Sequence, residues 1–343
     1  SSLFADLNPG PPRLKQSLAE IFPTDTFVDV ALLEPLAVAG PSGQKLIDVL
    51  APLGLSFELV SGQVGAAAAR ALTRSILTKC IDLSVAANLA LSGMVAALLN
   101  GMGVPLPLIL LIVLALGAVL GAVNGVLVWK VGIPSIVVTL GTMTIYRGII
   151  FLMTDGAWVN AHQMTDDFKS LPRHVIFGLP VMGWIAIVVI GLAALFLTRT
   201  ALGRSFYAVG GNPHAAVYTG IDVGRTQAVA FVISGVLAAL TGYLWVARYA
   251  VAYVDIAGGF ELDVVAACVI GGIAIAGGAG TVWGAVLGAI FLGVIKNALP
   301  VVGISPFWQL AISGSAIILA VAFNARQGRK AGRIILKSAE ASA

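Results

Sequence analysis

Residues 104–129 read VPLPLILLIVLALGAVLGAVNGVLVW, a stretch that has no charged side chain and a single amide, Asn124. About 20 consecutive apolar residues are enough for a helix to cross a bilayer. The stretch is apolar on every face, whereas a strand of a membrane barrel would alternate between apolar and polar residues. It therefore predicts a helical membrane protein.

The composition of the whole chain agrees with a membrane protein. Of its 343 residues, 59% are apolar and 10% are charged, whereas soluble domains carry about 25% charged residues. We predict an all-α, polytopic transmembrane helical bundle with about eight recognisable spans. The sixth falls below about 17 residues and is expected to be broken or partly re-entrant. The predicted spans are Leu83–Leu99, Val104–Trp129, Pro134–Met153, Leu179–Leu197, Ala228–Ala247, Val264–Ala276, Val282–Ala298 and Pro306–Phe323.

The basic residues between these spans predict an orientation, because cytoplasmic loops are enriched in Lys and Arg. Counting the spans alternately places Lys79, Lys130, the Arg-containing loop 199–226 and the basic tail 326–343 on the cytoplasmic side. Loops 154–178 and 248–263, which hold most of the loop acids, fall outside. The transmembrane domain is thus expected at 79–325, preceded by an atypical polar region, 1–78, with no apolar run long enough to span.

Two glycine patterns predict close helix packing. Gly117, Gly121 and Gly125 recur every four residues, and so do Gly280, Gly284 and Gly288; such ridges let two helix backbones approach in lipid. GAVLGAVNGV at 117–126 also resembles GAVLGAIFLGV at 284–294, and IDLSVAANLALSGMVA at 81–96 resembles FELDVVAACVIGGIAIA at 260–276. Either an inverted repeat or chance similarity of small-residue helices explains the resemblance, and the sequence leaves both open.

Polar side chains within or beside spans are costly in lipid and are the candidates for a translocation pathway. Structural alternatives remain open: hydroxyls can bond back to helix carbonyls, and Asp82, Glu261 and Asp263 can cap helix N-termini. For Arg147 three roles stay open: its side chain can snorkel to the membrane interface, pair with Asp155 or face water. The candidates are Asp82, Ser84, Asn88, Asn124, Thr139, Thr142, Thr144, Arg147, Glu261, Asp263 and Asn297.

Catalytic chemistry has little support in the sequence. There is no G-x-x-x-x-G-K-[ST] or G-x-G-x-x-G sequence, so the chain is not expected to hydrolyse ATP itself. The three histidines fall in loops, Cys80 and Cys268 are expected to be buried packing thiols, and no cofactor, metal site or nucleic-acid partner is expected. No carboxylate is expected in the middle of a span, which weakens an ion- or proton-driven mechanism.

The loop 199–226 is a polar island between two spans. Its Gly210–Gly211–Asn212–Pro213 sequence predicts a turn, and residues 214–218 are expected to form one or two helical turns. A short helix is thereby presented on a cytoplasmic loop, where a partner protein can contact it.

Five motifs in the same order and spacing give the chain a family resemblance over residues 77–338. They are IDLSV at 81–85, TLGTMTIYRG at 139–148, GRSFYAVGGNPHAAVYTGI at 203–221, FELDVVAACVIGG at 260–272 and NALPVVGISP at 297–306. With these motifs the chain resembles the permease subunits of bacterial ABC sugar importers, in the ribose, arabinose and autoinducer-2 branch. Lys79–Cys80 and YLWVARYAVAYVDIA at 243–257 make it most similar to L-rhamnose importer permeases.

The resemblance implies a permease in the bacterial inner membrane that moves a monosaccharide inward. It implies three protein partners: a cytoplasmic ABC ATPase, a periplasmic sugar-binding protein, and a second permease subunit that is identical or a close paralogue. It also implies that loop 199–226 carries the coupling helix that docks on the ATPase. The positions carried over are Gly203, Arg204, Ala208, Gly210, Gly211, Asn212, Ala215, Ala216 and Gly220.

The front of the chain departs from the family pattern. Such permeases have about ten spans and begin with two apolar helices, which residues 1–76 do not supply, and Ser1 stands in place of an initiator Met. A truncated, substituted or frame-shifted front and a genuine divergence are the alternatives. Besides an ATP-driven importer, the sequence therefore leaves open an ion- or proton-driven transporter and a defective permease.

Overall fold

A computed structural model describes residues 78, 80–274 and 277–301, with isolated positions at 308, 311, 314 and 315. The predicted N-terminal region (except Thr78), Lys79, most of the eighth span and the basic tail lie outside the described residues. Everything below concerns the described part.

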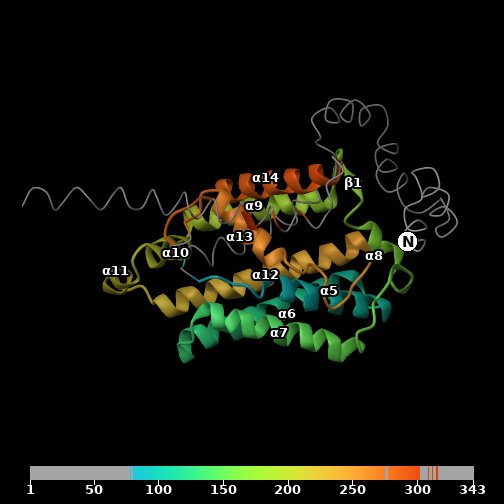
Figure 1. The fold of residues 1–343 in the computed structure, drawn as a ribbon, viewed down its shortest axis with the longest axis horizontal. Helices are drawn as coiled ribbons and strands as arrows, with labels where there is room; N and C mark the ends of the chain where they lie inside the picture. The colour runs from blue at the N-terminus through green and yellow to red at the C-terminus, as the bar shows by residue number, and fades with distance from the viewer. Residues whose placement is uncertain are drawn as a thin grey trace, which may run out of the picture. The chain divides into compact units, whose positions relative to one another are not determined.

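The described residues are mainly helical, as predicted, with only two short strands among them (Figure 1). Four helices are long and apolar enough to cross a membrane, at 106–131, 135–154, 181–199 and 223–249, and two shorter apolar helices lie at 85–101 and 282–298. The long helices are α5 Val85–Gly101, α6 Leu106–Val126, which continues as the π-helix η2 Leu127–Val131, α7 Ser135–Thr154, α9 Val181–Arg199, α12 Val223–Tyr249 and α14 Val282–Val301.

Prolines and left-handed residues set the helix ends. Pro105, Pro134 and Pro180 directly precede α6, α7 and α9; proline lacks the N–H that the first helical turn leaves unpaired. Gly132 (φ 80°) ends η2 and Asp155 (φ 50°) ends α7, because a left-handed residue stops the helix and turns the chain.

The sixth predicted span is replaced by a helical hairpin. Helix α13, Phe260–Ile270, has 11 residues and ends at Gly271, and α14 then packs against it (Figure 1). An 11-residue helix is about 16 Å long, too short to cross a bilayer. The expectation that this span is broken is thus confirmed.

Helix α12 is the centre of the best-packed region, which we call the slab: α5, α6 and α12. A Cβ on Gly235 of α12 would overlap the backbone of Gly117 in α6, and one on Gly242 would overlap Leu89 in α5. The first glycine ridge therefore packs as predicted. In the second, Gly284 meets Gly271, which directly follows α13, and Gly288 meets Ala267 of α13. Gly280 lies before α14 in a loop, so that ridge is shorter than predicted.

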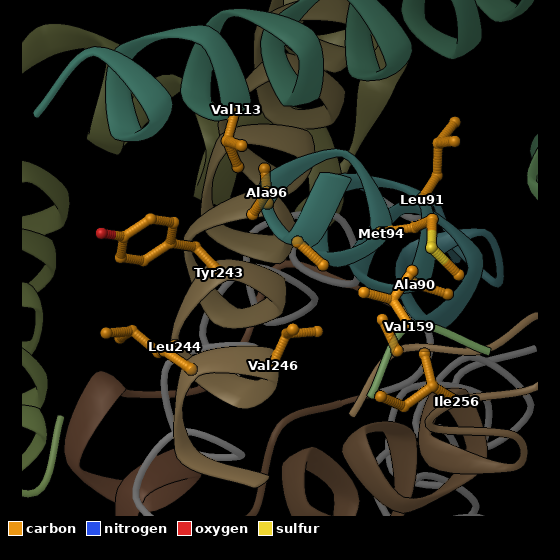
Figure 2. Close-up of a cluster of buried hydrophobic side chains, with 14 of the residues drawn as sticks. Ala90, Leu91, Met94, Ala96, Val113, Val159, Tyr243, Leu244, Val246 and Ile256 are labelled. Carbon is orange, nitrogen blue, oxygen red and sulfur yellow. The ribbon is translucent and has the colours of Figure 1, made fainter. Parts of the chain in front are cut away.

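Apolar side chains from the slab and from the two loops predicted to lie outside meet in one cluster (Figure 2). Phe168, in the short helix α8 Asp166–Ser170, is fully buried and lies edge-on to Tyr243 of α12, with ring centroids 5.2 Å apart. Val159 and Ala252 form an isolated antiparallel bridge between the loops. The remaining small elements there are η3 Ala161–Gln163, β1 Val175–Ile176 and its antiparallel partner β2 Leu179–Pro180. We call the loops 155–180 and 250–259 the outer cap.

Candidate functional site

The polar loop 199–226 folds into two helices, α10 Ala201–Gly211 and α11 Pro213–Tyr218. Asn212 caps α11, since its side-chain oxygen accepts a hydrogen bond from the Ala215 N–H at 3.1 Å. Thr200 and Asp222 cap α10 and α12 in the same way. The predicted short helix is confirmed, but the turn is shorter than predicted: Gly210 and Gly211 belong to α10, and Asn212 alone separates the two helices.

The nine residues that the family resemblance assigns to ATPase coupling include both buried and exposed positions. Gly203, Gly210 and Ala216 are buried; Gly203 is glycine because a Cβ there would overlap the backbone of α9 at Phe196. The other six are exposed on the loop: Arg204, Ala208, Gly211, Asn212, Ala215 and Gly220.

Sequence reasoning missed two apolar residues on α11. Val217 is 59% exposed and Tyr218 is 92% exposed. Their exposure at the end of a capped helix gives α11 an apolar contact surface, and the signal for it is a Val–Tyr pair in an otherwise polar loop.

The predicted pathway residues at the start of α5 form a buried polar cluster. The Asp82 carboxylate accepts hydrogen bonds from the hydroxyls of Ser84 and Ser234, both at 2.7 Å, and the Asn124 amide donates to Ser84 Oγ at 2.8 Å. One turn along α5, the Ser92 hydroxyl donates to Asn88 Oδ1 at 3.0 Å. Four of the pathway candidates named from the sequence, Asp82, Ser84, Asn88 and Asn124, lie in this region. Sequence reasoning missed Ser92 and Ser234, whose hydroxyls carry no distinguishing sequence signal.

Asp82 lies just before α5, at the end of a predicted span as expected, but it lies beside the middle part of α12. Its partner Ser234 lies about 16 Å along α12 from the first residue of that helix, at 1.5 Å per residue. Asp82 is only 2% exposed, and residues 80–84 beside it are not helical. Irregular backbone at such depth occurs where protein buries it or where it borders a pathway.

A second group of predicted residues lies at the outer ends of α13 and α14. Asp263 forms an ion pair with Lys296, and Asn297 is half-buried beside it on α14. One carboxylate oxygen of Glu261 is buried without a hydrogen-bond partner among the described residues. Neither acid caps α13, whose N-cap is Gly259; both lie in its first turn, where the helix dipole favours negative charge.

Arg147 and the threonines of α7 bond to other parts of the protein. Arg147 pairs with Asp255 of the outer cap at 2.5 Å, and not with Asp155. Thr139, Thr142 and Thr144 donate to carbonyls of their own helix at 2.9, 3.1 and 3.2 Å. These hydroxyls therefore bond back to helix carbonyls, which was the structural alternative to a pathway role. The Thr139 hydroxyl also lies 3.4 Å from the Ile81 carbonyl oxygen, beside the polar cluster. Cys80 and Cys268 are both buried, as expected.

Comparison with known proteins decides the family. Residues 57–321 match the family model described as "Branched-chain amino acid transport system / permease component". The chain belongs to this permease family. The matched residues contain the slab, the outer cap, the α10–α11 loop and the α13–α14 hairpin. The polar cluster at Asp82 and the polar residues around Asp263 therefore both lie within the match.

Curated relatives are similar in sequence to this permease along most of its length. It is 36% identical over 266 residues to the autoinducer 2 import system permease protein LsrC of Escherichia coli O9:H4, covering 78% of this chain and 77% of the relative. It is 35% identical to LsrC of Photorhabdus luminescens over 254 residues, covering 74% and 76%, and 36% identical to LsrC of Enterobacter sp. over 293 residues, covering 84% and 83%. No solved structure matches the permease.

Proposed function

We propose that this permease is the membrane subunit of an ATP-driven importer in the bacterial inner membrane. It moves a monosaccharide into the cytoplasm, works as a pair with an identical or paralogous permease, receives the sugar from a periplasmic binding protein and docks a separate ABC ATPase through α11. The observation that carries the proposal is α11 itself: a capped helix with exposed Val217 and Tyr218, held between spans of a family permease.

The polar cluster supports a hydroxylated solute. Asp82, Ser84, Asn124 and Ser234 offer carboxylate, hydroxyl and amide groups inside the bundle, and these are the groups that exchange hydrogen bonds with sugar hydroxyls. L-Rhamnose is our specific substrate prediction, and autoinducer 2, named in the relatives, is the competitor. Uptake of each labelled compound, with the other in excess, distinguishes them.

The docking role predicts the effect of replacing residues 210–216 by a flexible linker of equal length. Because a flexible segment cannot hold α11 against a groove, we expect sugar-stimulated ATP hydrolysis by the assembled complex to disappear. The measurement is ATPase activity in proteoliposomes with and without loaded binding protein. A seven-residue linker at 174–180 in the outer cap is the matched control and leaves ATPase binding intact. Undiminished stimulation in the 210–216 variant would refute the docking role.

A gradient-driven transporter is the second candidate, and the buried Asp82 is the observation that favours it, since carboxylates inside a bundle can carry protons. It predicts uptake by the permease alone in liposomes under an ion or proton gradient. Uptake that requires ATP and the ATPase supports the importer instead.

A further inference from the structure

Helix α10 contacts a loop that is distant in sequence, the glycine loop at residues 277–280. The Tyr207 hydroxyl donates to the Gly280 carbonyl at 3.1 Å. On the same side of α10, a Cβ placed on Gly278 would overlap the backbone of Gly210 and Gly211. The two segments therefore touch backbone to backbone, with a side-chain hydrogen bond beside the contact.

The glycine loop has a defined shape. Gly277, Gly278 and Gly280 have φ values of 83°, 76° and 144°, which side-chain-bearing residues adopt only with strain. The loop is closed across its base, since the Ala274 N–H donates to the Ala279 carbonyl at 3.0 Å and the Gly277 N–H to the Ala274 carbonyl at 2.9 Å. A loop held in this way transmits a displacement instead of absorbing it.

The glycine loop is also fixed to the α13–α14 hairpin. Gly271 and Gly284 approach so closely that a Cβ on either would overlap the other's carbonyl, and Gly288 meets Ala267 in the same way. Such contact leaves little room for α13 to slide on α14. The hairpin and its loop thus form one body, whose outer end carries Asp263 and Lys296.

Helix α10 joins this body to α11. Phe206 of α10 is fully buried in the same apolar cluster as Ile273 and Val282, which flank the glycine loop. At the other end of α10, Asn212 alone leads into α11, and the Asn212 N–H still bonds to the Ala208 carbonyl at 3.1 Å. Because a single hydrogen-bonded residue joins the two helices, α10 is expected to move when α11 moves.

We propose that Tyr207, Gly278 and Gly280 are positioning residues that pass the movement of the ATPase-docked α11 to the α13–α14 hairpin. The proposal rests on the proposed docking role of α11 and adds the route by which docking acts on the pathway. The hairpin is the element displaced, and the contact between α10 and the glycine loop is the joint that couples its position to ATP hydrolysis.

The first test compares two alanine substitutions at left-handed glycines. Gly278→Ala places a methyl group in the contact with α10, whereas Gly272→Ala has the same backbone strain (φ 80°) with no atom within 4 Å of the new Cβ. In proteoliposomes with ATPase and loaded binding protein, we expect Gly278→Ala to lower the sugar transported per ATP by about fivefold or more. Its ATPase binding should be unchanged, and Gly272→Ala should keep the wild-type ratio. Equal ratios in both variants would overturn the proposal.

The second test, Tyr207→Phe, removes one hydroxyl and keeps the ring, so it decides the question if Gly278→Ala does not fold. We expect the complex to assemble and to hydrolyse ATP, with less sugar transported per ATP than in the wild type. An unchanged ratio overturns the proposal, and so does loss of ATPase binding, because Tyr207 would then act in docking. A wild-type complex without ATP-driven uptake would instead refute the proposed function itself, before any variant is compared.

Discussion

The slab and the α13–α14 hairpin use the same device, glycine against backbone, with different consequences. In the slab, glycines join three helices: Gly235 to α6 and Gly242 to α5. The outer half of the slab is also the centre of the cluster that anchors the outer cap. In the hairpin, Gly271, Gly284 and Gly288 join only α13 to α14. We infer that close packing builds a fixed scaffold when it branches. When it is confined to one pair, we infer a body able to move on the apolar side chains that it shares with the slab, such as Val85 and Ala238.

The largest expected effect separates these two uses of glycine. Gly235→Ala pushes a methyl group into the backbone of α6, and overpacking of this kind costs about 1–3 kcal/mol. Because α12 contacts both other slab helices, we expect faster amide hydrogen exchange throughout α5, α6 and α12, together with a lower midpoint of thermal unfolding. Gly288→Ala, the matched change in the hairpin, should speed exchange in α13 and α14 and leave α12 protected.

Hydrogen exchange followed by mass spectrometry resolves the helices separately. Loss of protection in α12 that is as large in Gly288→Ala as in Gly235→Ala would show that hairpin and slab unfold as one unit. The distinction between scaffold and movable body would then be wrong.

The polar cluster predicts a smaller effect within the slab. Asp82→Asn keeps an acceptor for one of the hydroxyls of Ser84 and Ser234, so we expect a loss of about 1 kcal/mol in the free energy of unfolding. Asp82→Leu leaves both hydroxyls without their acceptor and should cost more. Thermal unfolding in detergent measures both. If Leu is tolerated as well as Asn, the cluster does not hold α5 to α12 and serves the pathway alone.

Helix positions were predictable from the sequence because lipid requires long apolar runs. In the described residues six of the eight predicted spans fall on helices, and the first half of the sixth falls on α13. Helix α11 was predictable because Asn–Pro starts a helix within a polar loop. The position of Asp82 beside the middle part of α12 was not predictable, because it depends on where α12 passes the first turn of α5. Nor was the contact of Tyr207 with Gly280, because residues 73 positions apart in the chain leave no local pattern. The superposition of the two repeat segments stays a prediction; their glycine ridges contact different partners, α12 in the first and α13 in the second.

The smallest effect concerns the outer cap, which contacts the slab mainly through apolar side chains. Asp166 pairs with Lys169 at 2.7 Å while its carboxylate is 98% exposed, and the hydrogen bond and charge of Lys169 lower the pKa of Asp166 below its usual 3.8. A depressed pKa in the folded state contributes stability above the unfolded-state pKa, and this contribution is lost as the pH falls through the folded value. The difference in thermal midpoint between the wild type and Asp166→Asn should thus be small at about pH 7 and smaller still at about pH 3. Phe168→Ala, in the same short helix, removes a fully buried ring and should destabilise the cap at both pH values. A pH-dependent loss in Asp166→Asn as large as the loss in Phe168→Ala would mean that the cap is held by charge, and that it resembles neither the slab nor the hairpin.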